Sequence, residues 1–363
     1  MDFYVFSRLF DSAMQDNLHI LRVGSPHMHD SHATEGRPYP SGGLREAWRL
    51  LTRLNTIPRR VALSRYDGVV VRYPKWSLFH SGLTRRYGDR LITEHHTNEE
   101  AEAKAIGPWA GRWLSMLERH AGPGILRAVR GIVAVTPEIR AVELQKAGPK
   151  PSIVVSNGIS VQEIPFSGFR PFDGRLLRLL FVSSFYPSYR GLDRLLEGLI
   201  RYRGAVRVQL DLVGEVAPRY RRAIHAVNAG DHACVRLGGT VFDQPLEQHY
   251  GAAGLAVSTL GLHRMSMRQA CPLKAREYMA RGLPFIASYE DPDIPNDEPF
   301  TRRFPSDDSP IDIQRVVDFS REVSGKAGLS RRMREFAEQH LEWTVRLRCL
   351  YEFVGSLCRP PGP

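Results

Sequence analysis

The chain has few cysteines and no long apolar segment. Its four cysteines have neither a metal-site spacing nor the pattern of a disulfide framework: Cys234, Cys271, Cys349 and Cys358. Cysteines without a disulfide framework are typical of proteins in a reducing cytoplasm. No apolar run approaches the length of a membrane span, and the N-terminus lacks the basic-then-apolar order of a signal peptide. The sequence therefore predicts a cytoplasmic protein.

Acidic residues are also in the minority. The 39 Asp and Glu residues are outnumbered by 50 Lys and Arg residues, and the net charge of +11 calls for acidic partners such as nucleic acid, anionic lipid or phosphorylated substrates. The chain has no zinc-finger spacing and no aromatic-basic strand signature of an RNA-binding sheet, so no nucleic-acid partner is predicted. A length of 363 residues is comfortable for two domains, each with its own core.

The clearest local pattern is a helix followed by a strand. Pro272 suits the first helical turn, Gly282 suits the left-handed residue after the end, and Phe285–Ser288 is typical of a short buried strand. A helix that begins at Pro272 has unpaired N–H groups and a positive dipole end, which favour an anion. Lys274 and Glu277 lie three residues apart on one face near that end. A simple surface ion pair between them is the open alternative.

Strand-like runs alternate with helical runs, which predicts two doubly wound domains with parallel sheets. The expected strands are Leu18–Gly24, Tyr66–Arg72, Arg90–His96, Ile132–Val135, Ser152–Val155, Leu177–Ser183, Val208–Val213 and Leu255–Ser258. Phe3–Phe6 is an alternative first strand. The expected helices begin at Leu44 and after Gly191, cover 98–129, and form one stretch over 330–357 that contains Trp343. The polar segment 160–174, with its Gly and Pro residues, is the best linker.

Several polar residues fall where ligands bind in such sheets. Gly42 and Gly43 separate the strand from Leu18 and the helix from Leu44, as at the start of a nucleotide-handling domain. Two later strands end in the candidate residues Arg72, Glu94, His95 and His96. Because ligands bind beyond the carboxyl ends of parallel strands, these side chains are candidates for a site.

The segment from Pro272 to Pro284 carries a family resemblance. Its sequence, Pro-Leu-Lys-x-x-Glu-Tyr-Met-Ala-x-Gly-x-Pro, resembles the donor-binding signature of family 4 glycosyltransferases, which have the GT-B fold. The family pattern is Glu, seven residues, Glu. Here Glu277 takes the second position, and Gln269 stands at the first. Residues 258–264 are similar to the strand end and loop before the pattern, and a weaker similarity runs from about 18 to 351.

The resemblance implies a donor site in the second domain. Arg190, before Gly191, stands where the family usually has a lysine that binds the donor pyrophosphate, and a guanidinium suits phosphate. Ser183 and Ser184 stand where the family often has a second basic residue. The implied donor-binding residues are Gly42, Gly43, Ser184, Arg190, Gly191, Ala270, Cys271, Leu273 and Glu277. Glu277 would accept hydrogen bonds from a ribose diol, and the loop 237–240 would lie near the base.

The resemblance also implies catalytic and acceptor-side residues. His96, rather than His95, would lie near the transferred sugar; a solvated loop histidine is the alternative. Gln269 would face the sugar, and Lys274 would stabilise the leaving diphosphate. Arg72 and Glu94 are the expected acceptor-side residues.

The implied function is that of a retaining glycosyltransferase. It would move a sugar from a nucleotide-diphosphate sugar to a lipid-linked or glycan acceptor in bacterial cell-surface polysaccharide or lipopolysaccharide synthesis. The expected fold is α/β, with two Rossmann-like domains across a cleft: an acceptor-side domain over 1–165, a donor domain over 166–341, and a returning helix over 342–363. A catalytically silent binding protein, which Gln269 keeps open, and a nucleotide-sugar epimerase are the alternatives.

No cofactor and no metal are expected. Asp291 and Asp293 have the Asp-x-Asp spacing of metal-dependent glycosyltransferases of another fold, but they follow the signature strand rather than lying in that fold's context.

Two basic-aromatic groups predict peripheral binding to the anionic inner face of a membrane. One is Arg45, Arg49 and Arg53 beside Trp48, and the other is Trp109, Arg112 and Trp113. A solvated basic face above an ordinary core is the alternative.

Overall fold

The computed structural model describes residues 67–73, 75–104 and 109–358, and the chain divides into two compact units. The first unit runs to Ser156 and includes the residues from Trp343 onward, and the second is Asn157–Glu342. The predicted strand from Leu18, the loop with Gly42 and Gly43, and the helix from Leu44 lie outside the described residues.

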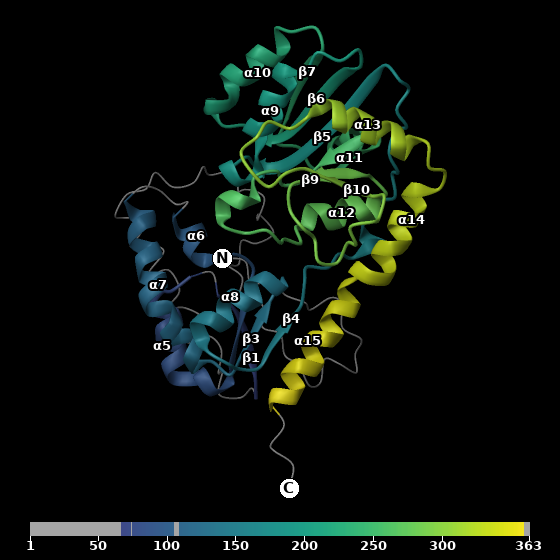
Figure 1. Cartoon of the computed structure of the whole chain (residues 1–363). Helices are drawn as coiled ribbons and strands as arrows, with labels where there is room; N and C mark the ends of the chain where they lie inside the picture. Colours follow the sequence, from purple (N-terminus) through teal and green to yellow (C-terminus); the bar gives the residue numbers. More distant parts are fainter. Residues whose placement is uncertain (1–66, 74, 105–108, 359–363) are drawn as a thin grey trace. The chain divides into compact units, whose positions relative to one another are not determined.

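The first unit holds a parallel sheet whose strands follow their order in the chain (Figure 1). The strands are β1 (Val69–Arg72), β2 (Leu91–His95), β3 (Gly131–Ala134) and β4 (Ser152–Val154). The helices between them are α5 (Leu78–Tyr87), α6 (Glu99–Lys104), α7 (Ala110–Ala128) and α8 (Pro137–Ala147). The four strands predicted between Tyr66 and Val155 are thus confirmed. Their observed ends lie within one or two residues of the predicted ends, except that β1 begins only at Val69.

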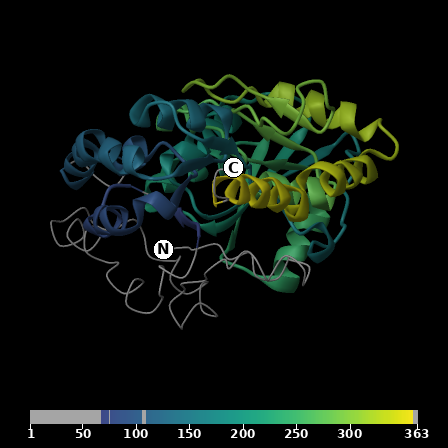
Figure 2. The same cartoon turned by 90° about the horizontal axis from the view of Figure 1, so that it is seen from below.

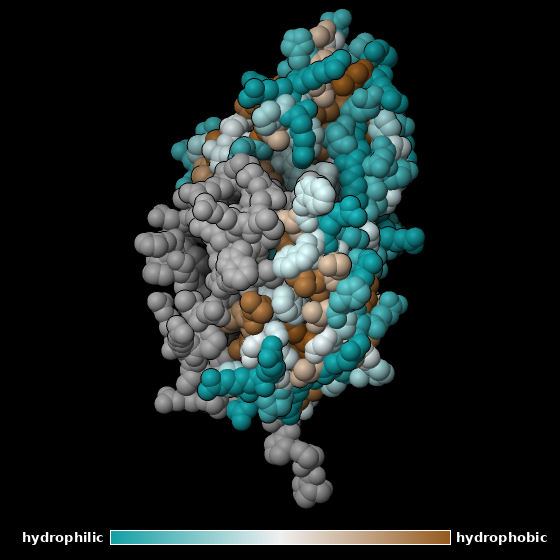
Figure 3. All heavy atoms as spheres, turned by 90° about the vertical axis from the view of Figure 1, so that its left-hand side faces the viewer, coloured by the Kyte–Doolittle hydropathy of each residue, from teal (hydrophilic) through white to brown (hydrophobic). Residues whose placement is uncertain are grey.

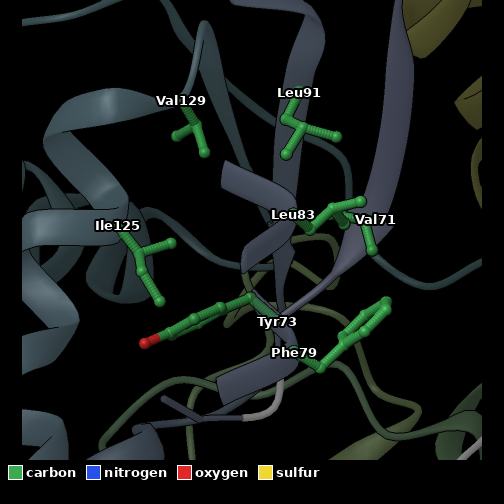
Figure 4. Close-up of a cluster of buried hydrophobic side chains, with 7 residues drawn as sticks. All are labelled: Val71, Tyr73, Phe79, Leu83, Leu91, Ile125 and Val129. Carbon is green, nitrogen blue, oxygen red and sulfur yellow. The ribbon is translucent and has the colours of Figure 1, made fainter. Parts of the chain in front are cut away.

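Successive side chains of β2 point to opposite faces of the sheet, so the core of this unit has a part on each face. Leu91 packs with Phe79 and Leu83 of α5 and with Ile125 of α7. Figure 4 shows this group together with Val71, Val129 and Tyr73, whose hydroxyl lies at its edge. The next residue, Ile92, packs with apolar side chains of α15 (Trp343–Cys358) on the other face. Figure 2 accordingly shows α15 in yellow and the blue helices α5 and α7 on different sides of the sheet.

The predicted helical stretch over 330–357 is helical but interrupted. The structure has α14 (Leu329–Phe336), a π-helical turn at Ala337–Leu341, an extended Glu342, and then α15. The break coincides with contacts to the segment after Ser156: the N–H of Ile159 donates to Leu341 O at 2.9 Å, and the N–H of Val161 donates to Glu342 Oε2 at 2.9 Å. These bonds place 157–165 with the second unit, so the chain divides before the expected boundary at 165.

The second unit holds a six-stranded parallel sheet in the order β10-β9-β8-β5-β6-β7. The strands are β5 (Leu176–Phe185), β6 (Arg207–Glu215), β7 (Ala233–Gly239), β8 (Leu255–Val257), β9 (Phe285–Ala287) and β10 (Thr301–Arg303). The helices are α9 (Leu192–Arg201), α10 (Arg221–Asn228), α11 (Asp243–Ala252), α12 (Leu273–Arg281) and α13 (Ile313–Ser324). Leu237 and the two glycines after it end the edge strand β7 instead of forming a loop.

The strand order makes this sheet doubly wound. From β5 the chain adds β6 and β7 on one side and β8, β9 and β10 on the other, so the order reverses between β5 and β8. The side chains of β6 are buried from Val208 to Gly214, without alternation, because helices cover both faces. The predicted α/β architecture with two parallel sheets is confirmed. Within the described ranges, no helix is long and apolar enough to cross a membrane.

Candidate functional site

The loops after β5, β8 and β9 meet at the carboxyl edge of the second sheet. The N–H of Leu260 donates to Arg190 O at 3.0 Å, and the N–H of Gly261 donates to Tyr189 O at 3.1 Å. The N–H of Ser288 donates to Thr259 O at 3.0 Å. These bonds join three neighbouring strand ends where the strand order reverses, which is the usual ligand position in open parallel sheets.

Two glycines allow this close approach. Gly191 has φ +71°, and a Cβ there would lie 2.7 Å from the carbonyl carbon of Leu260. Gly214, at the end of β6, has φ +121°, and a Cβ there would lie 1.6 Å from Ser183 O. Only glycine fits such positions without moving a neighbouring loop. Gly191 was expected at the site, and Gly214 was not, although a glycine directly after an apolar strand is a recognisable signal.

Helix α12 begins at this edge as the signature predicts. Gly282 ends it with φ +74°, as expected. Pro272 is the N-cap with extended backbone (φ −66°, ψ 140°), so the helix begins one residue later than expected, at Leu273. The first N–H groups of the helix precede its regular bonds between turns, although that of Ala275 donates to Pro272 O at 3.0 Å, and the helix dipole adds positive potential there.

The loop before α12 is held in place by backbone bonds. The N–H of Ala270 donates to Glu290 O at 3.0 Å, and the N–H of Glu290 donates to Arg268 O at 2.9 Å. Cys271 is buried, and its carbonyl accepts a bond of 2.9 Å from the amide of Asn157. Gln269 and Ala270 are therefore half-buried on a fixed loop, and Leu273 is exposed at the start of the helix.

Two cations at this edge have no carboxylate in ion-pair contact among the described residues. Lys274 Nζ donates to Val182 O at 3.0 Å and lies 5.0 Å from the centre of the Phe181 ring. Arg190 Nη1 donates to Thr259 Oγ1 at 3.0 Å, and its buried Nε has no acceptor among the described residues. Burial, reinforced by the charge of Arg190, lowers the pKa of Lys274 well below its usual value, and Glu277 acts weakly in the opposite direction. Ser184 lies exposed near the end of β5.

Glu277 does not pair with Lys274, so the simple ion pair that the spacing allowed is wrong. Its Oε1 accepts a bond of 3.0 Å from Arg281 Nε, one helical turn later. Arg281 also binds both carboxylate oxygens of Glu247 on α11 at 2.6 Å and stacks on the ring of Tyr250 at 3.8 Å. The carboxylate of Glu277 is therefore oriented by a buried arginine. The sequence analysis did not identify Arg281 or Thr259 as part of the site.

Asp291 and Asp293 form ion pairs with an arginine side chain. The fully buried guanidinium of Arg276 binds both oxygens of Asp291 at 2.6 and 3.0 Å and Asp293 Oδ2 at 2.5 Å. Its Nε donates to Asn157 O at 2.9 Å. This pairing accounts for the Asp-x-Asp spacing without a metal ion.

The first unit places the expected acceptor-side residues together. Arg72 and Glu94 are register partners at the ends of β1 and β2. His96 follows β2, with Nε2 3.2 Å from Glu94 Oε1. Burial acts to raise the pKa of Glu94, but the nearby His96 and Arg72 outweigh it, and the pKa is lowered. His95 is fully buried, whereas His96 is partly exposed, and the choice of His96 as the residue near the sugar stays a prediction.

Two family models match the chain. Residues 12–163 match Glycosyltransferase Family 4, and residues 177–308 match Glycosyl transferases group 1. The two ranges together cover most of the chain, and each falls largely within one structural unit. No curated protein matches the chain significantly.

Solved structures of glycosyltransferases share the fold. A glycosyltransferase from Rickettsia africae has a TM-score of 0.60 and 12% identity over 93% of this chain and 89% of that one. Sucrose-phosphate synthase from Thermosynechococcus elongatus has a TM-score of 0.58 and 18% identity over 82% and 76%. Anabaena HepE, solved with UDP and glucose, has a TM-score of 0.56 and 13% identity over 88% and 84%. The chain is therefore a glycosyltransferase of the GT-B fold, with a family 4 domain followed by a group 1 domain.

Proposed function

We propose that the chain is a retaining glycosyltransferase that uses a nucleotide-diphosphate sugar. The observation that carries this proposal is the pair of cations at the point where the strand order reverses. In the part of the chain that the structure describes, neither Lys274 nor Arg190 has a carboxylate in ion-pair contact. Charges that are partly removed from water need an anionic partner, and a diphosphate supplies one.

The neighbouring groups suit the rest of such a donor. The N-terminal ends of α9 and α12 add dipole charge, so the two helices and two cations stabilise the leaving diphosphate without a metal. An anion beside Lys274 would favour its charged form and so raise its pKa. Glu277, oriented by Arg281, accepts hydrogen bonds from the ribose. Ser184, Gly191, Ala270, Cys271 and Leu273 complete the donor site. UDP and glucose in the HepE structure support the same class of donor.

In the first unit, His96 acts on the substrate with its ring oriented by Glu94, and Arg72 and Glu94 bind the acceptor. The donor-phosphate role expected for Gly42 and Gly43 falls outside the described residues. The acceptor is a lipid-linked intermediate or a glycan of cell-surface polysaccharide synthesis.

Substitution of Lys274 tests this function. Wild-type protein is screened with nucleotide sugars for thermal stabilisation, and the best donor is then used in transfer assays with lipid-linked and glycan acceptors. Lys274→Met should retain the fold and lose about 10²–10³ in transfer rate, because an electrostatic contact to the leaving group is removed. Lys326→Met, which removes an exposed lysine of the same unit, is the matched control. An unchanged rate in Lys274→Met would contradict the assigned role.

Gln269 supports a second candidate, a catalytically silent binding protein. A glutamine retains one acceptor oxygen but loses the charge that the family places beside the sugar. Gln269→Glu should raise the transfer rate or change the preferred sugar if the chain is an enzyme. Donor binding without transfer in both wild type and variant would favour the binding protein. Conversion of the bound nucleotide sugar without any acceptor would instead indicate an epimerase.

We also propose that α7 contacts an anionic membrane surface on the cytoplasmic side. Trp109, Trp113 and Met116 are 84%, 44% and 51% exposed, and Arg112 is exposed between them at helical spacing. Figure 3 views the molecule from the side on which α7 lies in Figure 1 and shows brown and pale surface beside the grey atoms. Exposed tryptophan and arginine side chains are typical of helices that lie in a membrane interface.

A further inference from the structure

A second set of ionisable side chains lies at the carboxyl edge of the first sheet and has no part in the proposed donor site. It comprises His95 at the end of β2, Glu99 at the start of α6, and Glu143 on α8. His95 Nδ1 lies 2.7 Å from Glu99 Oε1 and 3.6 Å from Glu143 Oε2. All three side chains are 0% exposed, and one ligand atom from each lies within 4.8 Å of the others.

The protein does not satisfy these buried groups by itself. Glu99 Oε2, Glu143 Oε2 and His95 Nε2 have no hydrogen-bond partner among the described residues. A buried polar atom without a partner is unfavourable, and more so when it is charged. A nearby buried carboxylate, Glu118, shows the contrast, because it accepts bonds from the hydroxyl of Tyr73 and the N–H of Trp76.

Among the lysines and arginines of the described ranges, only one is in ion-pair contact with the two glutamates of the set. Lys146 Nζ lies 2.6 Å from Glu143 Oε1 and 3.7 Å from Glu99 Oε2. It reaches the set from the surface, since its side chain is 21% exposed. One ammonium group therefore faces two buried carboxyl groups.

We propose that His95, Glu99 and Glu143 bind a divalent transition-metal ion, with Zn²⁺ as the best-fitting candidate. One imidazole nitrogen and two carboxylate oxygens form a donor set that Zn²⁺ accepts. Mg²⁺ and Ca²⁺ fit less well because they prefer oxygen ligands only. The flexible side chain of Lys146 moves toward solvent when the ion enters. The ion joins β2, α6 and α8 and stabilises the strand end before His96, and it takes no part in sugar transfer.

The test begins with metal-stripped full-length protein titrated with Zn²⁺ by calorimetry, with the Co²⁺ absorption spectrum as a second measurement. The expected result is one tight site per chain and a raised Tm. Glu143→Gln should weaken binding by more than about 10–100-fold, the usual loss for a residue that only supports a ligand. Glu138→Gln, on the same helix but outside the set, is the control and should bind like wild type.

Lys146→Met separates the metal site from a salt-bridge network. If the ion is the natural cation, loss of the competing ammonium strengthens Zn²⁺ binding, and Zn²⁺ restores the Tm of the variant. If Lys146 is the only cation of the set, the variant is destabilised and Zn²⁺ does not restore it, which overturns the proposal. The proposal is also overturned if neither wild type nor Lys146→Met binds Zn²⁺ stoichiometrically. It is overturned as well if Glu143→Gln and Glu138→Gln bind Zn²⁺ equally. Donor binding is measured separately, so failure here leaves the proposed transfer untouched.

Discussion

The carboxyl edges of the two parallel sheets carry different ionisable groups. In the second unit, Arg190 and Lys274 lie at the strand ends, and no described carboxylate is in ion-pair contact with either. In the first unit, His95, Glu99 and Glu143 gather at the same edge with one lysine. The fold gathers polar side chains at this edge in both units, and the identity of these side chains decides whether the edge suits an anion or a cation.

The two edges also differ in access. Leu273 and Ser184 are exposed beside the cations of the second unit. The set His95, Glu99 and Glu143 of the first unit is wholly buried. The exposed edge suits the exchanging substrate that we propose for the second unit, and the buried set suits the structural ion that we propose for the first.

The largest expected effect concerns Arg276, a cation of the second unit whose partners are all protein groups. Arg276→Met should lower the free energy of unfolding by about 3–5 kcal/mol, because it leaves Asp291 and Asp293 buried without their counter-ion. Urea unfolding measures this loss. Arg332→Met, which breaks an exposed pair with Glu298, should cost only about 0–1 kcal/mol. Equal losses in both variants would show that the buried pairing contributes little.

Glu277 is the carboxylate of the anion-binding edge, and its substitution tests the ribose assignment. Glu277→Gln should weaken nucleotide binding by about 1.5–3 kcal/mol, the range for a hydrogen bond to a charged group. Stability should change little, since Arg281 keeps its bonds to Glu247. Calorimetry with the best nucleotide measures the change. Unchanged affinity would remove Glu277 from the site and leave it a structural partner of Arg281.

Buried His80 makes the stability of the first unit sensitive to acid. Its Nδ1 lies 2.8 Å from Ser77 Oγ and its Nε2 lies 3.2 Å from Arg72 O. Burial lowers the pKa of His80 to about 4; the bond to Arg72 opposes this, and His95 and Lys75 add to it. A lowered histidine pKa means that stability is complete above pH 6.5 and is lost as the pH falls toward 4.

His80 alone should therefore account for about 2 kcal/mol of the stability lost between pH 7 and pH 5. Unfolding curves of wild type and His80→Gln at both pH values isolate this part, because the other titrating groups are common to both proteins. The acid-induced loss should be smaller in His80→Gln by that amount. The same loss in both proteins would mean that His80 titrates normally.

The smallest expected effect concerns the exposed face of α7. Arg112→Ala should weaken binding to anionic vesicles by about 1 kcal/mol, the usual value for a basic residue near a charged membrane surface. Arg201→Ala, on an exposed arginine of the second unit, is the control. Co-sedimentation no stronger with anionic than with neutral vesicles would rule out the membrane contact.

Local sequence predicted several elements of the second unit, but not β7, β10, α10, α11 or α13. The glycine at 282 ends α12 because few other residues adopt a positive φ, and the apolar runs around 180, 210 and 256 form buried parallel strands. The signature alone located the N-terminus of α12 to within one residue. These features depend on backbone sterics and on the periodicity of apolar residues, both of which are set by a few neighbouring residues.

Tertiary structure decided the partners of the charged side chains. Helical spacing allows Glu277 to meet either Lys274 or Arg281, and the position of α12 on the sheet directs Lys274 to Val182 instead. Glu143 reaches His95 only because α8 packs beside β2, at a distance along the chain that no local pattern covers. The break at Glu342 depends on a bond from Val161. Such contacts join segments far apart in the sequence, so only the folded chain brings these charges together.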